Sequence, residues 1–227
     1  MSRRVRVVVT RAREGADRLS GRLRDEGFEV LECPLVRIEA IDGPPLLAGA
    51  YDWVLLTSAR GVDHLLRRLQ GPMPPVAAIG PGTADALRAH GIEPALVAEV
   101  STQEGLAAAV RERTGGAPGR VLFPAAEGAR DELARALGAE VVPVYRTVSE
   151  RPERFPPAEL VVLASGSAAR AFAALDLELP CVSIGPTTTA EARRCGLAVL
   201  AEAERHDLDG LVAAVRLAAC RLGSSPS

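Results

Sequence analysis

Two stretches of the sequence share a pattern that could bind an anion. In each, a short apolar run leads into Ile-Gly-Pro, hydroxyl-bearing residues follow, and alanine-rich sequence continues to a glycine, over residues 76–91 and 181–196. The pattern predicts a buried strand, a sharp turn and a helix that begins on a threonine N-cap. Free backbone N–H groups and the positive end of the helix dipole favour anions at such a helix start. Two copies predict one extended anionic ligand held by two similar sites.

Hydroxyl-bearing residues also follow two other apolar runs, residues 53–56 and 161–163. Helix capping, worth about 1 kcal/mol for each helix, is the simpler role for these hydroxyl groups. The same helix start can also bind a carboxylate, so the two roles are compatible. The candidate ligand-binding residues at the four turns are Thr57, Ser58, Ala59, Gly80, Thr83, Ser165, Gly166, Ser167, Gly185, Pro186, Thr187 and Thr188.

Two arginines, Arg11 and Arg13, follow the first apolar run of the chain. Their guanidinium groups could reach a carboxylate, and an exposed, solvated position is equally compatible with the sequence. The second half of the chain has Ala125 and Ala126 in the corresponding region. This asymmetry favours a binding role for the two arginines.

The elements that would position these residues alternate between strand and helix. Short β-branched or apolar runs at residues 5–9, 29–34, 53–56, 76–79 and 95–97 are separated by segments with helical periodicity. One of these helices is expected to carry Leu65, Leu66 and Leu69, and another to span about residues 103–112. Regular alternation predicts an α/β fold in which helices cover a parallel sheet.

The chain also repeats itself. Ile184 lies 105 residues after Ile79, and residues 142–146 resemble residues 33–37. This self-similarity indicates a tandem duplication. Periodicity alone would place the boundary between two domains near Gly115-Gly116, and it also allows two similar domains that share no site.

Composition excludes several classes of function. The 227 residues include no lysine, which removes lysine Schiff-base chemistry, and the net charge of -2 argues against a nucleic-acid-binding surface. The four cysteines have no C-x-x-C spacing and are expected to be reduced, structural thiols. We expect no signal peptide and no membrane span, and hence a cytoplasmic protein.

Neither a metal nor a nucleotide cofactor is expected. His64, His90 and His206 are isolated and are interpreted as structural or solvated. Gly80-Pro81-Gly82 resembles the start of a dinucleotide-binding turn, but Asp85 stands where the third glycine is needed, and Walker-type glycine loops are missing from the sequence.

The order of five motifs resembles the uroporphyrinogen-III synthase family of the tetrapyrrole pathway, over nearly the whole chain. The motifs are Leu-Thr-Ser-Ala-Arg-Gly-Val at 56–62, Ala-Ile-Gly-Pro-Gly-Thr-Ala at 78–84, Pro-Val-Tyr-Arg-Thr at 143–147, Ala-Ser-Gly-Ser-Ala-Ala at 164–169 and Ser-Ile-Gly-Pro-Thr-Thr at 183–188. No motif is specific alone, but the order of all five is.

The resemblance implies two similar α/β domains, each a parallel sheet flanked by helices, joined by a two-segment extended linker. Domain 1 is then expected to combine residues 1–35 with 150–227, and domain 2 to comprise residues 38–144. Residues 36–37 and 145–149 form the implied linkers. The resemblance therefore moves the boundary away from Gly115-Gly116.

The resemblance implies a cofactor-independent lyase of heme and porphyrin biosynthesis. Such an enzyme cyclises the linear tetrapyrrole hydroxymethylbilane with loss of water and inversion of the terminal pyrrole ring, to give uroporphyrinogen III. Without the enzyme, the linear substrate closes to the uninverted isomer. The protein must therefore control geometry more than supply strong acids.

Tyr145 is the candidate catalytic residue. The first copy of the repeat has Val36 at this position, so symmetric packing does not account for a phenol. A phenol could protonate or hydrogen-bond the departing hydroxyl group of the substrate. The alternative role is a linker tyrosine that packs between domains.

Other functions remain open at this point. A non-catalytic two-domain module that binds or senses a tetrapyrrole or another small molecule would keep the fold without the activity, and an unrelated sugar or nucleotide enzyme is a third alternative. The resemblance implies a small polycarboxylate substrate and a monomer without nucleic-acid or membrane partners, with transient contact to the preceding pathway enzyme.

Overall fold

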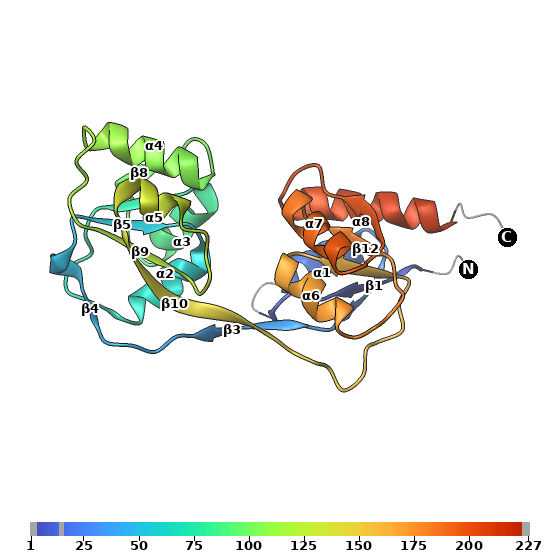
Figure 1. The fold of residues 1–227 in the computed structure, drawn as a ribbon. Coiled ribbons are helices and arrows are strands. Elements are labelled where there is room, and N and C mark those ends of the chain that lie inside the picture. The colour runs from blue at the N-terminus through green and yellow to red at the C-terminus, as the bar shows by residue number, and fades with distance from the viewer. Residues whose placement is uncertain (1–3, 14–15, 224–227) are drawn as a thin grey trace. The chain divides into compact units, whose positions relative to one another are not determined.

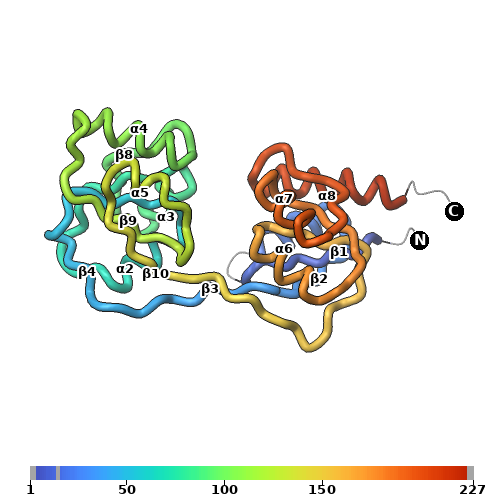
Figure 2. The backbone as a smooth tube through the Cα atoms, viewed as in Figure 1, coloured from blue at the N-terminus to red at the C-terminus, as the bar shows by residue number. Residues whose placement is uncertain are grey.

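The computed structural model describes residues 4–13 and 16–223, and the chain divides into two compact units (Figure 1). Unit 1 combines residues 1–38 with 147–227, and unit 2 comprises residues 39–146. Figure 2 shows the consequence in colour, because blue and orange-to-red segments pack together in unit 1. Gly115 and Gly116 lie inside unit 2.

The sheet of unit 1 has five parallel strands in the order β13-β12-β11-β1-β2 among the described residues. Helices cover both of its faces, because side chains alternate along each strand. Val7 and Val9 pack with α1 and α8 in one apolar cluster, and Val8 packs with α6 and α7 in another. The elements of unit 1 are β1 (Arg6–Val9), α1 (Ala16–Asp25), β2 (Glu29–Glu32), β11 (Leu160–Leu163), α6 (Gly166–Ala173), β12 (Cys181–Ser183), α7 (Pro186–Arg194), β13 (Val199–Glu202) and α8 (Leu208–Gly223).

Unit 2 has the same layered construction. Its main sheet has the order β3-β10-β9-β5-β7-β8, and the pairs from β10 to β8 are parallel. Leu55 and Phe123 pack with α4 and α5, and Leu56 and Leu122 pack with α2 and α3. The elements that lie in unit 2 are β4 (Leu46–Leu47), a 3-10 turn (Ala48–Ala50), β5 (Trp53–Leu56), α2 (Ala59–Leu66), β6 (Leu69–Gln70), β7 (Val76–Ala78), α3 (Pro81–Ala89), β8 (Leu96–Val97), α4 (Gln103–Arg113), β9 (Val121–Ala126) and α5 (Glu132–Leu137), and two strands, β3 (Val36–Ala40) and β10 (Glu140–Ser149), cross its boundary.

The two units share one topology because the two sequence repeats exchange a strand–helix–strand segment. Unit 1 has the strand order β2-β1-β11-β12-β13, and unit 2 has the equivalent order β10-β9-β5-β7-β8. The first two strands of each repeat thus join the last three strands of the other repeat. In each unit the strand order reverses at one place, between β1 and β11 or between β9 and β5, and ligands of parallel α/β sheets bind outside the carboxyl ends of strands at such places.

The predicted α/β class, with two similar domains of parallel sheets flanked by helices, is confirmed. The two-segment extended linker stays a prediction, and the residues assigned to it lie within β3 and β10. One helix prediction is wrong at its end, because α2 stops at Leu66 and Leu69 forms the short strand β6, which pairs with β4. In the described ranges, no helix is long and apolar enough to cross a membrane.

Candidate functional site

The candidate residues of unit 2 gather at the carboxyl edge of its sheet. Leu56 and Ala78 are paired at the ends of β5 and β7, so Ser58 and Gly80 follow neighbouring strands. Tyr145 of β10 is paired with Ala126, the last residue of β9. Because these strands are parallel, the residues that follow them meet at one edge of the sheet.

Ser58 links the start of α2 to Tyr145. It is the N-cap of α2, with extended backbone angles, and its Oγ accepts a hydrogen bond of 3.0 Å from the backbone N–H of Gly61. The same Oγ lies 3.2 Å from the Tyr145 hydroxyl oxygen. A hydroxyl group carries one hydrogen and two lone pairs, so Ser58 can accept from Gly61 and donate to Tyr145. In that arrangement the Tyr145 proton is available to a ligand.

The backbone around Tyr145 is held in place on both sides. The pairing of β10 with β9 shifts register between Pro143 and Tyr145, as at a β-bulge, and bulges change the direction in which side chains point. The Tyr145 carbonyl oxygen accepts from the Glu127 N–H at 2.8 Å. The Pro143 carbonyl oxygen accepts from Nη1 of Arg68 at 3.1 Å. The strand is therefore anchored where it presents the phenol.

His64 of α2 packs against the Tyr145 ring. The ring centroids are 5.2 Å apart and the planes differ by 24°, which is a stacked arrangement. Burial, followed by the charge of Arg67, lowers the pKa of His64 from its ordinary value of 6.5, with a smaller opposing effect from Asp63. From the sequence, His64 was predicted to be structural or solvated. Its stack on Tyr145 joins two segments that are distant in the chain, so no local motif indicates it.

Unit 1 presents a second group of candidate residues at the equivalent edge. Ser165 is the N-cap of α6, and its Oγ accepts from the Ala168 N–H at 3.2 Å. Ser167 accepts through Oγ from Nη2 of Arg170 at 3.3 Å. Arg11 is half-buried and Arg13 is exposed, both directly after β1. The serine N-caps predicted after both apolar runs are thus present.

The two Ile-Gly-Pro turns differ from the prediction in one respect. The N-caps of α3 and α7 are glycines, Gly80 and Gly185, rather than threonines, and neither makes a side-chain cap hydrogen bond. Proline occupies the first helical position, where its missing N–H costs nothing. This placement puts Thr83 and Thr188 two residues further into their helices, where both are buried.

At both glycine N-caps, the side chain of another segment approaches closely, and the backbone angles are extended. A Cβ at Gly185 would lie 2.7 Å from Cδ2 of His206, and a Cβ at Gly80 would overlap the side chain of Ser101. The contact of Gly185 with His206 and that of Gly80 with Ser101 occupy equivalent positions in the two repeats. Thr187, in contrast, is exposed beside the turn, where a ligand could reach it.

Charged residues of α6 and α7 form ion pairs with one another. Glu191 forms ion pairs of 2.8 Å with both Arg170 and Arg194. Hydrogen bonds from Arg194 and then Arg170 lower the pKa of Glu191 to about 2. This triad ties α6 to α7, so Arg170 serves the packing of the two helices.

In the described ranges, the structure supports neither a metal site nor reactivity of the two buried thiols. Among residues 4–13 and 16–223, no group of three or more His, Cys, Asp or Glu side chains could hold a metal ion. Burial raises the pKa of the Cys181 thiol to about 12 and also raises the pKa of Cys33. These two thiols are therefore poor nucleophiles.

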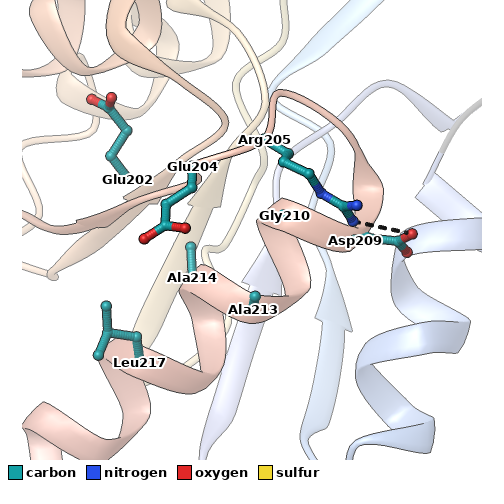
Figure 3. Close-up of a pocket in the computed structure, with 8 residues that line it drawn as sticks. All are labelled: Glu202, Glu204, Arg205, Asp209, Gly210, Ala213, Ala214 and Leu217. Atoms are coloured by element: carbon teal, nitrogen blue, oxygen red, sulfur yellow. Dashed lines mark ion pairs between the residues drawn. The ribbon is translucent and has the colours of Figure 1, made fainter.

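A hollow of about 390 Å³ lies beside α8 of unit 1 (Figure 3). Its rim carries the carboxylates Glu202, Glu204 and Asp209, and Arg205 turns toward Asp209, with 3.4 Å between Nη2 and Oδ2. The excess of negative charge would repel an anionic ligand. A similar hollow beside α4 of unit 2, of about 580 Å³, indicates a packing feature shared by both repeats.

The structure thus groups the predicted residues by unit. Tyr145, Ser58 and the adjoining Thr57 and Ala59 form one group with Gly80 and Thr83, all of them in unit 2. The second group, in unit 1, comprises Arg11, Arg13, Ser165, Gly166, Ser167, Gly185, Pro186, Thr187 and Thr188. Tyr145 is present in the first group alone.

Comparison with known proteins gives one consistent result. Residues 17–213 match the family model described as uroporphyrinogen-III synthase HemD. The uroporphyrinogen-III synthase of Synechococcus elongatus is 27% identical over 252 residues, which cover 92% of this chain and 93% of that protein. A putative uroporphyrinogen-III synthase of Methanocaldococcus jannaschii is 29% identical over 156 residues, covering 66% of this chain and 64% of that protein.

Solved structures share the fold. The uroporphyrinogen-III synthetase of Helicobacter pylori superposes with a TM-score of 0.68 at 18% identity, covering 96% of this chain and 99% of that one. A mutant uroporphyrinogen III synthase of Thermus thermophilus gives a TM-score of 0.59 at 17% identity, with 96% and 99% of the two chains covered.

Proposed function

Because this chain belongs to the uroporphyrinogen-III synthase family, we propose that it cyclises hydroxymethylbilane to uroporphyrinogen III. The enzyme is then a cyclising lyase of heme biosynthesis. The observation that carries this function is the match of residues 17–213 to the family model. The contact between Ser58 and Tyr145 supplies a chemical group suited to the reaction.

The overall reaction removes one molecule of water and forms one carbon–carbon bond. The C–O bond of the hydroxymethyl group breaks, and the resulting electrophilic carbon is attacked by the substituted carbon of the terminal pyrrole ring. The spiro intermediate then fragments and recloses with that ring inverted. Hydroxide leaves together with a proton, so atoms and charge balance.

Tyr145 is proposed to assist the departure of the hydroxyl group. Its phenol would donate a hydrogen bond or proton to the leaving oxygen, and Ser58 would hold the phenol oxygen from the other side. A proton donated by the phenol is regained from the substrate proton that is released during ring closure. Because a phenol is a weak acid, the residue accelerates the step without being indispensable.

The substrate carboxylates are proposed to bind at the carboxyl edges of the two sheets. The substrate class carries eight carboxylates, and helices α2, α3, α6 and α7 all begin at these edges. Helix N-termini favour anions because their first N–H groups lack partners within the helix. The exposed Thr187 and the two arginines after β1, Arg11 and Arg13, would add side-chain donors.

We further propose that the enzyme acts in the cytoplasm as a monomer without a cofactor. The net charge of -2 supports a small-molecule substrate over nucleic acid. Transient contact with the preceding pathway enzyme would shorten the exposure of an unstable substrate. Light scattering during size-exclusion chromatography, with and without that enzyme, tests the monomeric state and the contact.

Isomer analysis of the cyclised product tests the function. Hydroxymethylbilane is made in situ, the protein is added, and the product is oxidised and separated by chromatography. We expect mostly the inverted isomer III with active protein and only the uninverted isomer I with heat-denatured protein. Isomer I alone in both samples would contradict the function and would leave a tetrapyrrole-binding module as the alternative, which direct binding measurements would then test.

A further inference from the structure

One aromatic contact in unit 2 is not accounted for by the chemistry described above. The His64 imidazole stacks on the Tyr145 phenol, with 5.2 Å between the ring centroids and 24° between the planes. The other side of the Tyr145 residue is fixed through its hydroxyl group, which lies 3.2 Å from Ser58 Oγ. Ring and hydroxyl group are therefore held by two residues of the same segment, one at the start of α2 and one within it.

The position of the imidazole leaves one of its ring nitrogens without a hydrogen-bond partner among the described residues. Nδ1 of His64 is buried and has no hydrogen-bond partner among the described residues. A buried polar atom without a partner is destabilising, and such atoms in a folded protein call for an explanation. Hydrogen bonding to Nδ1 within the described residues thus does not explain the position of His64, whereas its ring is stacked on the Tyr145 ring.

The duplication provides an internal comparison for this contact. The N-cap serines Ser58 and Ser165 align the sequences of helices α2 and α6. In this alignment His64 corresponds to Ala171. Tyr145 corresponds to Val36 in the other repeat. Val36 and Ala171 belong to the same apolar cluster of unit 1. Unit 1 therefore has two apolar residues of one cluster at the positions where unit 2 has two stacked aromatic rings.

We propose that His64 is a positioning residue for Tyr145, whose stacked imidazole holds the phenol in the orientation that the reaction needs. This inference rests on the proposed function. Aromatic stacking restricts the tilt of the phenol ring, and the Ser58 hydrogen bond restricts its hydroxyl oxygen. The imidazole acts through its flat face, so another flat ring of similar size serves equally well.

The test compares variants that keep or remove this flat face. His64→Ala removes it, His64→Leu keeps bulk without it, and His64→Phe restores it. The matched control is His90→Ala, which removes an imidazole that contacts α2 through Asp63, with 2.9 Å between Nε2 and Oδ1, and for which no contact with Tyr145 is found among the described residues. Each variant is assayed for kcat, KM and the ratio of product isomers, and His64→Ala is also measured in a Tyr145→Phe background.

A second readout reports on the phenol directly. The chain contains two tyrosines, so tyrosine ring labelling for NMR gives two sets of signals, which Tyr145→Phe assigns. Removing a stacked ring should shift and broaden the Tyr145 signal, because ring-current shielding and ordering are both lost. This readout does not depend on turnover.

We expect His64→Ala and His64→Leu to lower kcat by about three- to tenfold, the range that corresponds to one aromatic contact, with KM unchanged. His64→Phe should restore both kcat and the Tyr145 signal, and should raise the melting temperature because the unpartnered nitrogen is gone. His90→Ala should have the kcat, KM and isomer ratio of the wild type. In the Tyr145→Phe background, His64→Ala should change kcat by less than about twofold, since the phenol hydroxyl it positions is missing.

Three results would overturn the inference while leaving the proposed function intact. These are wild-type kcat in His64→Ala, an equal loss in the Tyr145→Phe background, and failure of His64→Phe to restore activity although it folds. A wild-type protein that makes only the uninverted isomer would overturn the proposed function and this inference together.

Discussion

Replacing Ser58 removes two hydrogen bonds that serve different purposes. The bond from the Gly61 N–H caps α2, and the contact with the Tyr145 hydroxyl orients the phenol. Loss of a serine N-cap costs about 1 kcal/mol of stability when alanine replaces it, but only about 0.3 kcal/mol when glycine does. Loss of a hydrogen bond costs about 1 kcal/mol, which corresponds to about fivefold in a rate constant.

These magnitudes make Ser58→Ala and Ser58→Gly an informative pair. Both variants lose the hydroxyl group beside Tyr145, so both should lower kcat by about fivefold. Only Ser58→Ala should show the larger loss of stability in urea unfolding. Activity and stability should therefore separate between the two variants.

Thr102→Ala is the matched control. Thr102 is the N-cap of α4 in the same unit, and its Oγ1 accepts from the Gly105 N–H at 3.0 Å. The variant should lose about 1 kcal/mol of stability, as Ser58→Ala does, with unchanged kcat. Recovery of kcat in Ser58→Gly, or a fivefold loss of kcat in Thr102→Ala, would refute the reasoning, because activity would then follow capping rather than the contact with Tyr145.

Three further predictions concern packing, charge and metal. Gly210→Ala places a Cβ against the backbone carbonyl of Arg205, so urea unfolding should show a loss of about 1–3 kcal/mol; an unchanged midpoint would contradict the packing described. Because Arg194 and Arg170 hold the folded-state pKa of Glu191 at about 2, below its ordinary 4.5, its charge stabilises the fold above pH 4.5 and this contribution is lost as the pH falls toward 2. Glu191→Gln should therefore melt below the wild type at neutral pH, and the difference should shrink over that window; a constant difference would contradict this. Chelator treatment should leave activity unchanged, as measured by product formation before and after dialysis, and loss that added metal restores would contradict a metal-free mechanism.

Local signals in the sequence were sufficient for the fold class and for two helix starts. Alternating apolar runs and helical periodicity predicted parallel sheets covered by helices, which is confirmed. Ser58 and Ser165 were predicted to cap helices and do so. These features depend on residues within one turn of each other, so the sequence contains the information directly.

The threonine caps were wrong for a local reason that propensity alone does not resolve. Ile-Gly-Pro places proline at the first helical position, and this fixes the preceding glycine as N-cap. Thr83 and Thr188 then fall inside the first turn and are buried. Proline therefore determines where each helix begins, although a threonine that could cap a helix follows it.

Non-local pairing could not be read from periodicity. Each repeat gives its first two strands to the sheet of the other, so β1 pairs with β11 rather than with β5. The contact between Ser58 and Tyr145 joins residues 87 positions apart, and the stack of His64 on Tyr145 depends on the same pairing. Side chains brought together by an exchange of segments carry no short-range signal.

Tyr145 is proposed to assist formation of the inverted macrocycle. The most direct measurement is the initial rate and isomer ratio for Tyr145→Phe beside the wild type, with hydroxymethylbilane made in situ. We predict a fall in kcat of about a hundredfold, the lower end of general acid catalysis, with isomer III still formed above the spontaneous background. A variant with wild-type kcat would contradict a role for the phenol in the reaction.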